Sequence, residues 1–386
     1  MKSVLRRSRC PPQNLRSSKV RHDALDALVS SPPRAVLPKI QHSRLQATIN
    51  SACKMWILDG AFAEELVRVH GKAITNTPLW SASCITTDPG AIQTVHASYL
   101  AAGADIFLTS TYQAAPSNLS ATYKIDRAAA ESILRQGVQL ALDVRDKSAV
   151  PGKQVALSLG SFGATLADGS EFTGAFAKTT TRAELAAFHA DRLRAFGAEI
   201  LGKVDWLAFE TVPTIVEVHA ILDALRDVRA EGLPVALAWI SVSARNDAET
   251  GAGDAIETVA RAIADANFGT VASLPPFNGK PFPAVILGIN CTPPEYLTGL
   301  LRKIHAAQPN VPVVVYPNIG EQWDGAKRCW IEGSGWTDDE YARVAKEEWA
   351  PLGVVGVGGC CRTTPSTIRA LRRAFGGETS DKDAAS

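Results

Sequence analysis

The sequence predicts a single (β/α)8 barrel, an α/β fold in which eight parallel strands close into a cylinder inside a ring of helices. From residue 55 onward, short apolar runs alternate about eight times with segments whose apolar residues recur at helical spacing. The apolar runs are continuous, as expected for strands of a parallel sheet that is covered on both faces. The glycine-rich turn at 356–361 lacks the third glycine of a dinucleotide-binding motif, and no P-loop is present. A doubly wound open sheet is therefore the weaker alternative.

The predicted elements follow one another in regular order. Helical spacing is clearest at 127–144, 182–196, 214–228 and 338–349. The loops at 160–174 and 317–336 are long and contain glycines and aromatic residues, so we expect them to close over a substrate. The Pro- and Gly-rich stretch 274–283 precedes a strand and is expected at the opposite, non-catalytic end. The eight strands are predicted at 55–58, 105–108, 155–159, 206–209, 235–240, 284–289, 311–316 and 352–357.

Charge and composition narrow the range of functions. The 386 residues carry 40 Lys and Arg against 39 Asp and Glu, a net charge of +1, so neither nucleic acid nor an anionic membrane surface is predicted as a partner. No apolar run approaches the roughly 18 residues of a membrane span. We expect small-molecule substrates and a monomeric protein.

The N-terminal segment differs in composition from the rest of the chain. Residues 1–50 contain 10 Lys and Arg and 2 Asp, a net +8, and the remainder is −7 (30 minus 37). This Ser-, Pro- and Arg-rich segment lacks apolar periodicity and is predicted to be a disordered extension. We assign 1–50 to this extension, 51–375 to the barrel and 376–386 to a polar tail. A cytoplasmic location is expected, and the basic, acid-poor start also allows an organelle transit peptide.

Three of the seven cysteines stand at strand ends, and the irregular spacing of the seven is not typical of a disulfide framework. Cys360 and Cys361 follow the last predicted strand and Gly358-Gly359, and Cys291 follows the sixth. Three such thiols can bind Zn²⁺ and leave its fourth position open, as in a catalytic site. The glycines give the backbone the freedom that two adjacent ligands need. A vicinal disulfide or two buried thiols are the alternatives for Cys360-Cys361. The other cysteines carry no ligand pattern: Cys10, Cys53, Cys84 and Cys329.

A substrate thiol in the open zinc position would be ionised, although a free thiol has a pKa of about 8.5. An amino-acid thiol also brings an ammonium group, which Asp59 and Glu210, at the ends of the first and fourth strands, can bind. The alternatives are a helix N-cap for Asp59 and an exposed ion pair for Glu210. Asn290 is expected to face the same end of the barrel and to contact substrate. Four aromatic residues are expected to line a pocket for a cationic donor: Trp80, Tyr112, Phe162 and Trp323.

These residues stand in motifs of a known family. In chain order the motifs are Leu58-Asp59-Gly60-Ala61, Leu79-Trp80-Ser81-Ala82, 109–114, 167–174, Phe209-Glu210-Thr211, Gly288-Ile289-Asn290-Cys291, Tyr316-Pro317-Asn318 and 359–365. With them, residues 55 to about 375 resemble the zinc-dependent homocysteine S-methyltransferases, especially the branch that uses S-methylmethionine or S-adenosylmethionine. The resemblance implies a (β/α)8 barrel, with Cys291, Cys360 and Cys361 as catalytic residues and zinc ligands. It also implies homocysteine held by Asp59 and Glu210.

The function implied is methyl transfer from a sulfonium donor to zinc-bound homocysteine thiolate, giving methionine. Betaine as donor and selenocysteine as acceptor are alternatives on the same barrel, and the sequence does not rank S-methylmethionine against S-adenosylmethionine. A non-catalytic redox sensor, in which Cys360 and Cys361 form a reversible disulfide, is an alternative from another class. Ile319 stands where a serine is usual, and the extension 1–50 has no counterpart in the family.

Overall fold

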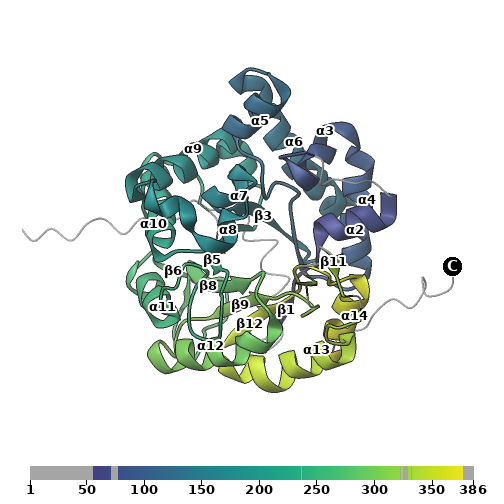
Figure 1. The fold of residues 1–386 in the computed structure, drawn as a ribbon, viewed down its shortest axis with the longest axis vertical. Coiled ribbons are helices and arrows are strands. Elements are labelled where there is room, and N and C mark those ends of the chain that lie inside the picture. Colours follow the sequence, from purple (N-terminus) through teal and green to yellow (C-terminus); the bar gives the residue numbers. More distant parts are fainter. Residues whose placement is uncertain are drawn as a thin grey trace, which may run out of the picture. The chain divides into compact units, whose positions relative to one another are not determined.

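The computed structural model describes residues 55–70, 77–235, 237–321, 323–324, 329–331 and 333–376. Eight strands form one parallel sheet in the order β1-β12-β9-β8-β5-β4-β3-β2. A parallel bridge between Leu58 and Ile106 joins the two edges of this sheet, so the barrel is nearly closed inside the ring of helices in Figure 1. The strands are β1 (Trp56–Ile57), β2 (Ile106–Leu108), β3 (Gln154–Gly160), β4 (Trp206–Val212), β5 (Leu237–Val242), β8 (Val285–Asn290), β9 (Val313–Tyr316) and β12 (Val354–Val357).

The predicted fold class is confirmed, because each of the eight strands coincides with a predicted apolar run. Every residue of β3, β4, β5 and β8 is buried, which is why the sequence shows continuous rather than alternating apolar runs there. The strands β3 and β4 continue beyond their predicted ends, to Gly160 and Val212. The extension 1–50 and the tail beyond Gly376 lie outside the described residues.

The four predicted helices are confirmed as α6 (Arg127–Lys147), α9 (Arg182–Leu201), α10 (Ile215–Ala230) and α13 (Asp338–Val344), the last continued by the π turn η4 (Ala345–Trp349). Side chains of Asp126, Thr181, Thr214 and Thr337 cap their first turns. Gly197 kinks α9 with a φ of 76°. The other helical elements are α2 (Phe62–His70), η2 (Trp80–Ser83), α3 (Cys84–Thr87), α4 (Pro89–Ala101), α5 (Pro116–Tyr123), α7 (Phe162–Leu166), α8 (Ser170–Thr173), η3 (Ala175–Lys178), α11 (Ile256–Asp265), α12 (Pro294–Ala307), η5 (Ala350–Leu352) and α14 (Pro365–Ala374).

Aromatic side chains close the N-terminal end of the barrel. Trp56 begins β1 and packs edge-on against Trp206 at the start of β4, with ring centroids 5.3 Å apart. Phe282 contacts Trp56 at 5.7 Å and belongs to a short hairpin of β6 (Thr270–Val271) and β7 (Phe282–Pro283). Leu274 is buried in the same cluster. The stretch 274–283 therefore lies at the end opposite to the strand C-termini, as predicted.

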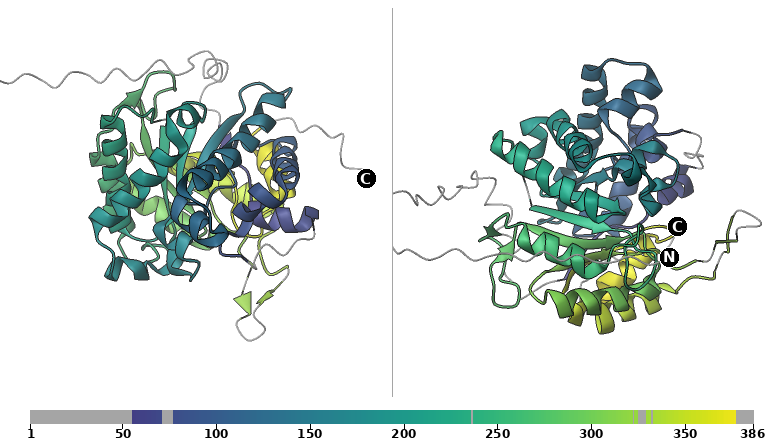
Figure 2. Two further views of the ribbon diagram at one scale, coloured as in Figure 1. Left: turned by 90° about the horizontal axis from the view of Figure 1, so that it is seen from above. Right: turned by 60° about the vertical axis from the view of Figure 1, so that its left-hand side comes forward.

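Two long loops leave the C-terminal ends of the strands. The loop after β3 folds into the short helices α7 and α8 and the turn η3. The loop after β9 contains a two-stranded ribbon of β10 (Trp323–Asp324) and β11 (Cys329–Trp330), which projects away from the helices in Figure 2. Both segments were predicted as long loops at this end, where the functional groups of such barrels are found.

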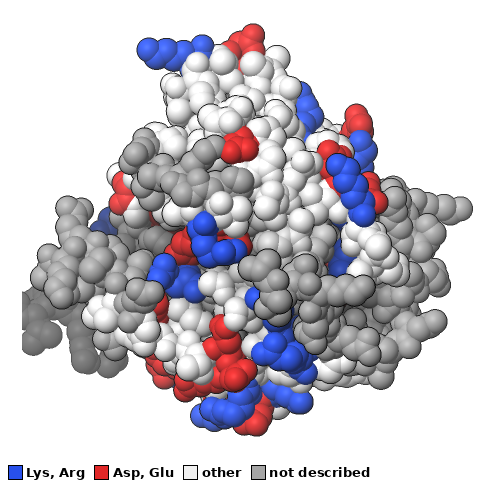
Figure 3. All heavy atoms as spheres, turned by 90° about the vertical axis from the view of Figure 1, so that its right-hand side faces the viewer, with Lys and Arg blue, Asp and Glu red and all other residues white. Residues whose placement is uncertain are grey.

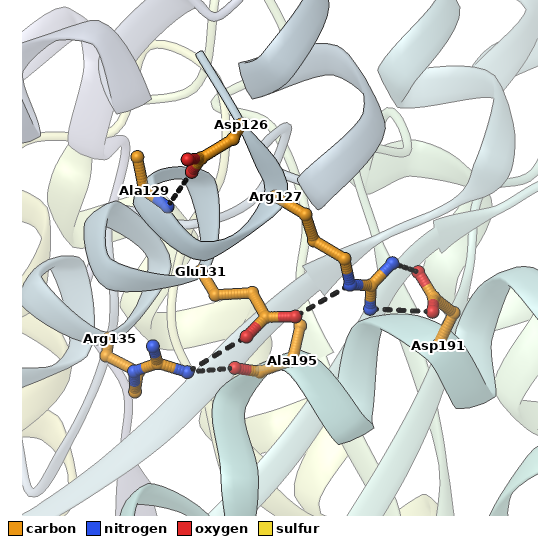
Figure 4. A network of polar contacts seen from close by, with 7 residues as sticks. All are labelled: Asp126, Arg127, Ala129, Glu131, Arg135, Asp191 and Ala195. Carbon is orange, nitrogen blue, oxygen red and sulfur yellow. Dashed lines mark hydrogen bonds and ion pairs between the residues drawn. The ribbon is translucent and has the colours of Figure 1, made fainter.

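Ion pairs connect helices on the outer surface. Arg127 of α6 contacts Glu131 on its own helix and Asp191 of α9, and Arg135 donates to the backbone oxygen of Ala195 at 2.8 Å (Figure 4). Figure 3 shows basic and acidic side chains close together on one face, with a broad uncharged surface beside them. The side chains of Arg127 and Asp191 are 54% and 45% exposed, so water screens this pair and it adds at most about 1 kcal/mol. Among the described residues, no helix is both long enough and apolar enough to cross a lipid bilayer.

Candidate active site

Three thiols converge at the C-terminal mouth of the barrel. Cys291 follows β8, and Cys360 and Cys361 follow β12. The three Sγ atoms all lie within 4.8 Å of one another, and those of Cys360 and Cys361 are 4.0 Å apart without a disulfide bond. In the sheet, β9 lies between β8 and β12, so the curvature of the barrel brings together side chains that are 69 and 70 positions apart in sequence. The structure therefore brings together Cys291, Cys360 and Cys361, as expected from the sequence.

Close backbone packing holds the adjacent cysteines in place. A Cβ atom on Gly358 would lie 2.5 Å from the Cβ of Leu58, and one on Gly359 would lie 2.3 Å from Oγ1 of Thr363. The amide of Gly359 donates to the backbone oxygen of Asp59 at 2.9 Å. Neither glycine has a positive φ. Glycine is therefore required here for close approach to Leu58, just after β1, and to Thr363, rather than for the conformational freedom expected from the sequence.

The electrostatics of the trio favour a bound cation. Hydrogen bonds from the Cys291 and Cys360 thiols hold the pKa of Cys361 well below its usual range. The same contacts, with burial, raise the pKa of Cys360. The protein alone therefore favours one thiolate that is stabilised by two thiols. Three sulfur donors at this separation, with no carboxylate or imidazole among them, fit the preference of Zn²⁺ for thiolate ligands.

Two buried carboxylates face the same mouth and form no ion pair among the described residues. Asp59, 4% exposed, accepts a hydrogen bond from the amide of Leu108 at 2.9 Å, and Glu210, 6% exposed, accepts one from the hydroxyl of Ser158. Among the described ion pairs, none includes either carboxylate. Burial raises the pKa of Asp59, and the charge of Glu210 adds to the effect. Burial also raises the pKa of Glu210, to about 7.

These contacts argue against the alternative roles of Asp59 and Glu210 that the sequence allowed. Asp59 bonds to a neighbouring strand rather than capping a helix, and Glu210 lies inside β4 rather than in an exposed ion pair. Two desolvated carboxylates that have no ion pair among the described residues carry a free-energy penalty, which a bound ammonium group would offset.

The aromatic residues predicted for the pocket take different positions. Trp80, 40% exposed, begins η2 with a φ of 49°, a conformation that is strained for a bulky residue. Tyr112 packs on Gly160, where an added Cβ would lie 2.9 Å from the ring. Phe162 instead packs with Phe188 and Phe176, with ring centroids 5.1 and 5.5 Å apart, in a small satellite core. The side chain of Trp323 lies outside the described residues.

Comparison with known proteins places the chain in a family. Residues 56–375 match the family model described as homocysteine S-methyltransferase. The chain belongs to the homocysteine S-methyltransferase family. It is 38% identical over 328 residues to homocysteine S-methyltransferase 1 of Arabidopsis thaliana, which covers 82% of this chain and 92% of that protein. It is also 38% identical over 331 residues to a selenocysteine Se-methyltransferase of Brassica oleracea var. italica, covering 82% and 88% of the two chains.

Solved structures agree with this membership. The metallated form of the homocysteine methyltransferase MmuM from Escherichia coli superposes with a TM-score of 0.66 at 30% identity, covering 86% of this chain and 99% of that one. The family resemblance predicted from the motifs is therefore confirmed. The chain is a methyltransferase, and the alternative of a non-catalytic thiol sensor is not supported.

Thr211 is a residue of this methyltransferase that the sequence analysis did not single out. It lies within β4 with a φ of 56°, where the pairing with β5 shifts register between Phe209 and Val212. The side chain of Asn290 accepts from the Thr211 amide at 2.9 Å and donates to its hydroxyl at 2.8 Å. Asn290 was predicted to contact substrate, and its amide has these partners within the protein. The signal available in the sequence was the motif Phe209-Glu210-Thr211.

Arg192 was also missed, because a long charged side chain in the middle of a helix normally predicts a solvated face. It is fully buried on α9, and its guanidinium donates to the backbone oxygens of Thr111, Tyr112 and Gly160 at 2.7 to 2.8 Å. Burial lowers the pKa of Arg192 to about 10. The side chain thereby fixes the backbone of the loop that carries Tyr112. Ile319, the departure from the family motif, is buried, and its amide donates to the backbone oxygen of Cys361 at 3.0 Å.

Proposed function

We propose that the protein transfers a methyl group from a sulfonium donor, S-methylmethionine or S-adenosylmethionine, to the sulfur of homocysteine, giving methionine. The observation that carries the proposal is the pairing of two unlike sites at one mouth. Three thiols converge within 4.8 Å, and two buried carboxylates that form no ion pair within the described part of the chain face the same space. A substrate with one thiol and one ammonium group satisfies both sites.

Cys291, Cys360 and Cys361 are the residues that would hold the metal, which we propose is Zn²⁺. Zinc supplies the positive charge that lowers the pKa of a substrate thiol and leaves one coordination position for it. The protein contributes the backbone that keeps the three sulfur atoms together, through the tight packing of Gly358 and Gly359 on neighbouring segments. The metallated form of the relative from Escherichia coli supports the binding of a metal.

Asp59 and Glu210 bind the ammonium group of homocysteine in this proposal. Each charge-assisted hydrogen bond to a buried carboxylate contributes about 1.5–3 kcal/mol. The Leu108 amide and the Ser158 hydroxyl orient the two carboxylates, so little freedom is lost on binding.

The transfer step breaks the bond between the methyl carbon and the donor sulfur, which keeps the electron pair and becomes a neutral thioether. The homocysteine sulfur forms the new bond to carbon, and its proton leaves to solvent. Because the sulfonium charge disappears in this step, a carboxylate against the sulfonium would stabilise the ground state more than the transition state. Trp80 and Tyr112 offer aromatic faces instead, which attract a cation with less penalty.

Selenocysteine is a second candidate acceptor. The observation that favours it is the 38% identity to a selenocysteine Se-methyltransferase, equal to the identity with the homocysteine enzyme of Arabidopsis thaliana. Selenocysteine differs from homocysteine by its selenium atom and by a side chain one methylene shorter. The distance from the thiol cluster to Asp59 and Glu210 therefore decides which acceptor fits.

The test is side-by-side kinetics on reduced protein that has been reconstituted with zinc. Homocysteine or selenocysteine is combined with S-methylmethionine, S-adenosylmethionine or betaine, and the methylated product is measured together with metal content. We expect one zinc ion per chain and methionine from a sulfonium donor. Turnover with betaine alone, or full turnover without metal, would contradict the proposal.

A further inference from the structure

The loop after β3 holds an acidic residue whose charge is not balanced. Glu171 lies on α8, and its Oε2 atom is buried without a hydrogen-bond partner among the described residues. None of the ion pairs within the described part of the chain includes it. Asp168, three residues earlier, differs from it: its carboxylate accepts from the amide of Ser170 at 2.9 Å and is solvent-exposed. The two acids of this loop are therefore not equivalent.

Contacts within its own loop and with the loop after β5 fix the backbone around Glu171. A Cβ on Gly163 would lie 2.6 Å from the amide nitrogen of Glu171, and one on Gly251 would lie 2.2 Å from the backbone oxygen of Phe172. The hydroxyl of Ser243, after β5, donates to the backbone oxygen of Glu171 at 3.4 Å. Only glycine permits the two close approaches. Glu171 is thus held by packing and does not sit on a loosely attached surface turn.

Glu171 lies beside the aromatic part of the mouth. Burial raises the pKa of Tyr112, and the nearby charges of the Cys291 sulfur and of the Glu171 carboxylate add to this effect. Tyr112 is therefore within electrostatic reach of both the unbalanced carboxylate and the thiol cluster. Arg192 anchors the Tyr112 backbone from the other side, through its oxygen at 2.7 Å.

The proposed reaction needs more acidic groups than Asp59 and Glu210. Both homocysteine and a sulfonium amino-acid donor carry a primary ammonium group, so two substrates bring two such groups. Asp59 and Glu210 are coupled electrostatically to each other and serve one of them. Glu171, on the loop after β3, is a further carboxylate at this end of the barrel that forms no ion pair among the residues the structure describes.

We propose that Glu171 determines donor specificity by binding the primary ammonium group of an amino-acid methyl donor; this inference rests on the function proposed above. The ammonium charge is unchanged by methyl transfer, whereas the sulfonium charge is consumed. A carboxylate on the ammonium therefore stabilises ground state and transition state equally, which lowers KM for the donor without lowering kcat. Donors without a primary ammonium group, such as betaine, gain nothing from Glu171.

The experiment compares two donors on three zinc-loaded proteins. The donors are S-methylmethionine and its analogue without the amino group, (3-carboxypropyl)dimethylsulfonium. The proteins are the wild type, Glu171→Gln and the matched control Asp168→Asn, which changes an exposed acid of the same loop. We expect Glu171→Gln to raise KM for S-methylmethionine by about 10- to 100-fold, the effect of one charge-assisted hydrogen bond. Its kcat, its KM for homocysteine and its kinetics with the des-amino donor should stay within about twofold of wild type, and Asp168→Asn should resemble wild type throughout.

The outcomes separate this inference from the proposed function. A wild type that transfers methyl from sulfonium donors, with a Glu171→Gln variant equally impaired on both donors, overturns the role of Glu171 and leaves the function standing. A rise in KM for homocysteine instead of the donor does the same. No transfer from any sulfonium donor overturns both. Glu171→Asp, which keeps the charge but shortens its reach, should recover part of the S-methylmethionine affinity, and thermal unfolding of each variant verifies its fold.

Discussion

The two ends of this barrel differ in how well their side chains are packed and hydrogen-bonded. At the N-terminal end, Trp56, Trp206 and Phe282 pack edge to face, and the Trp206 indole donates to Gln154 at 2.9 Å. At the C-terminal mouth, some buried side-chain atoms have no hydrogen-bond partner among the described residues, and positive φ extends to residue types other than glycine and asparagine. The unpartnered atoms include those of Ser110, Gln113, Ser161, Ser170, Glu171 and Asn318, and the positive φ angles include those of Thr211, Cys291 and Arg362.

The comparison shows that the N-terminal end stabilises the fold, whereas the C-terminal mouth lowers the stability of the ligand-free protein. Apolar burial and satisfied polar groups at the N-terminal end stabilise the fold and do not contact substrate. Unpaired carboxylates, clustered thiols and strained backbone at the mouth each reduce stability in the absence of ligands. We therefore expect substitutions at the N-terminal end to lower stability and to leave substrate binding nearly unchanged. Substitutions at the mouth should impair activity or substrate binding without a comparable loss of stability.

The largest effect is expected from the thiols. Cys291→Ala, Cys360→Ala and Cys361→Ala should each abolish stoichiometric zinc binding and lower turnover by on the order of a thousandfold, because a two-thiolate site loses several kcal/mol of charge stabilisation. The fold should persist, since these residues do not belong to the core clusters. Metal analysis, kinetics and circular dichroism measure the three properties. The control is Cys84→Ala, which removes a buried thiol on α3 and should retain zinc. Full activity in any of the three variants would remove that residue from the site.

The reverse effect is expected at the opposite end. Trp206→Ala should lower the free energy of unfolding by about 3–5 kcal/mol, because a large ring leaves a fully buried position. Its KM values, measured well below the unfolding temperature, should remain within about twofold of wild type. Trp80→Ala makes the same change at the mouth, where the ring is 40% exposed, and should affect KM for the donor far more than stability. Equal stability losses in the two variants would break the comparison between the two ends.

Removing the charge of Glu210 should raise the stability of the protein and weaken its binding of homocysteine. Its pKa is raised from 4.5 to about 7, so its ionised form is disfavoured in the folded state, and stability is lost as pH rises through that interval. At pH 8, Glu210→Gln should therefore raise the free energy of unfolding by about 3 kcal/mol, with little change at pH 4. The same variant should raise KM for homocysteine at least about tenfold.

The pH dependence of KM gives a further measurement of this residue. In the wild type, KM for homocysteine should fall as pH rises towards about 7, where Glu210 ionises among Ser158, Tyr316, Arg192 and Asp59. In Glu210→Gln this contribution should be absent. Glu199→Gln, which changes an exposed acid, is the control for both measurements. A Glu210→Gln variant that is less stable than wild type at pH 8 would show that the Ser158 and Tyr316 hydroxyls and the charge of Arg192 outweigh the cost of burying the carboxylate.

The smallest effect concerns a polar group that lies at neither end. His96 of α4 is fully buried between Phe62 and Phe107, and neither ring nitrogen has a hydrogen-bond partner within the described part of the chain. Burial lowers its pKa from 6.5 to about 3, so the unfolded chain binds the proton more tightly and stability falls with falling pH below about 6.5. Between pH 7 and pH 5 this should remove about 2 kcal/mol, measured by urea unfolding. His96→Leu should lack that loss and His305→Gln should retain it; parallel pH profiles for wild type and His96→Leu would refute the assignment.

The pattern of apolar runs was enough to predict the barrel, because a parallel strand that is buried on both faces must be apolar at nearly every position. The positions of the thiols could also be predicted. Cys291, Cys360 and Cys361 directly follow such runs, and all parallel strands of a barrel end at the same mouth. The same rule located Asp59 and Glu210, whose neighbours are strand residues.

Residues that act through the backbone of another segment could not be predicted in this way. Arg192 has the helical spacing of an ordinary charged residue, and only the packing of α9 against the mouth makes three carbonyl oxygens its partners. The need for glycine at 251 arises from contact with Phe172, which lies 79 positions away in the sequence.

Sequence periodicity therefore determined the fold, the end of the barrel that carries the site, and the three sulfur atoms that lie there, because each depends on spacing along one strand or helix. The tertiary structure decided which polar groups are satisfied and which are left unpaired. Glu171 differs from Asp168 in this respect, because the Asp168 carboxylate accepts from a nearby amide, whereas Oε2 of Glu171 has no partner among the described residues. In the same way, the bond from Leu108 distinguishes Asp59 from an ordinary helix cap. The reason is physical: desolvation and hydrogen bonding depend on what several distant segments place around one atom, and no local pattern contains that information.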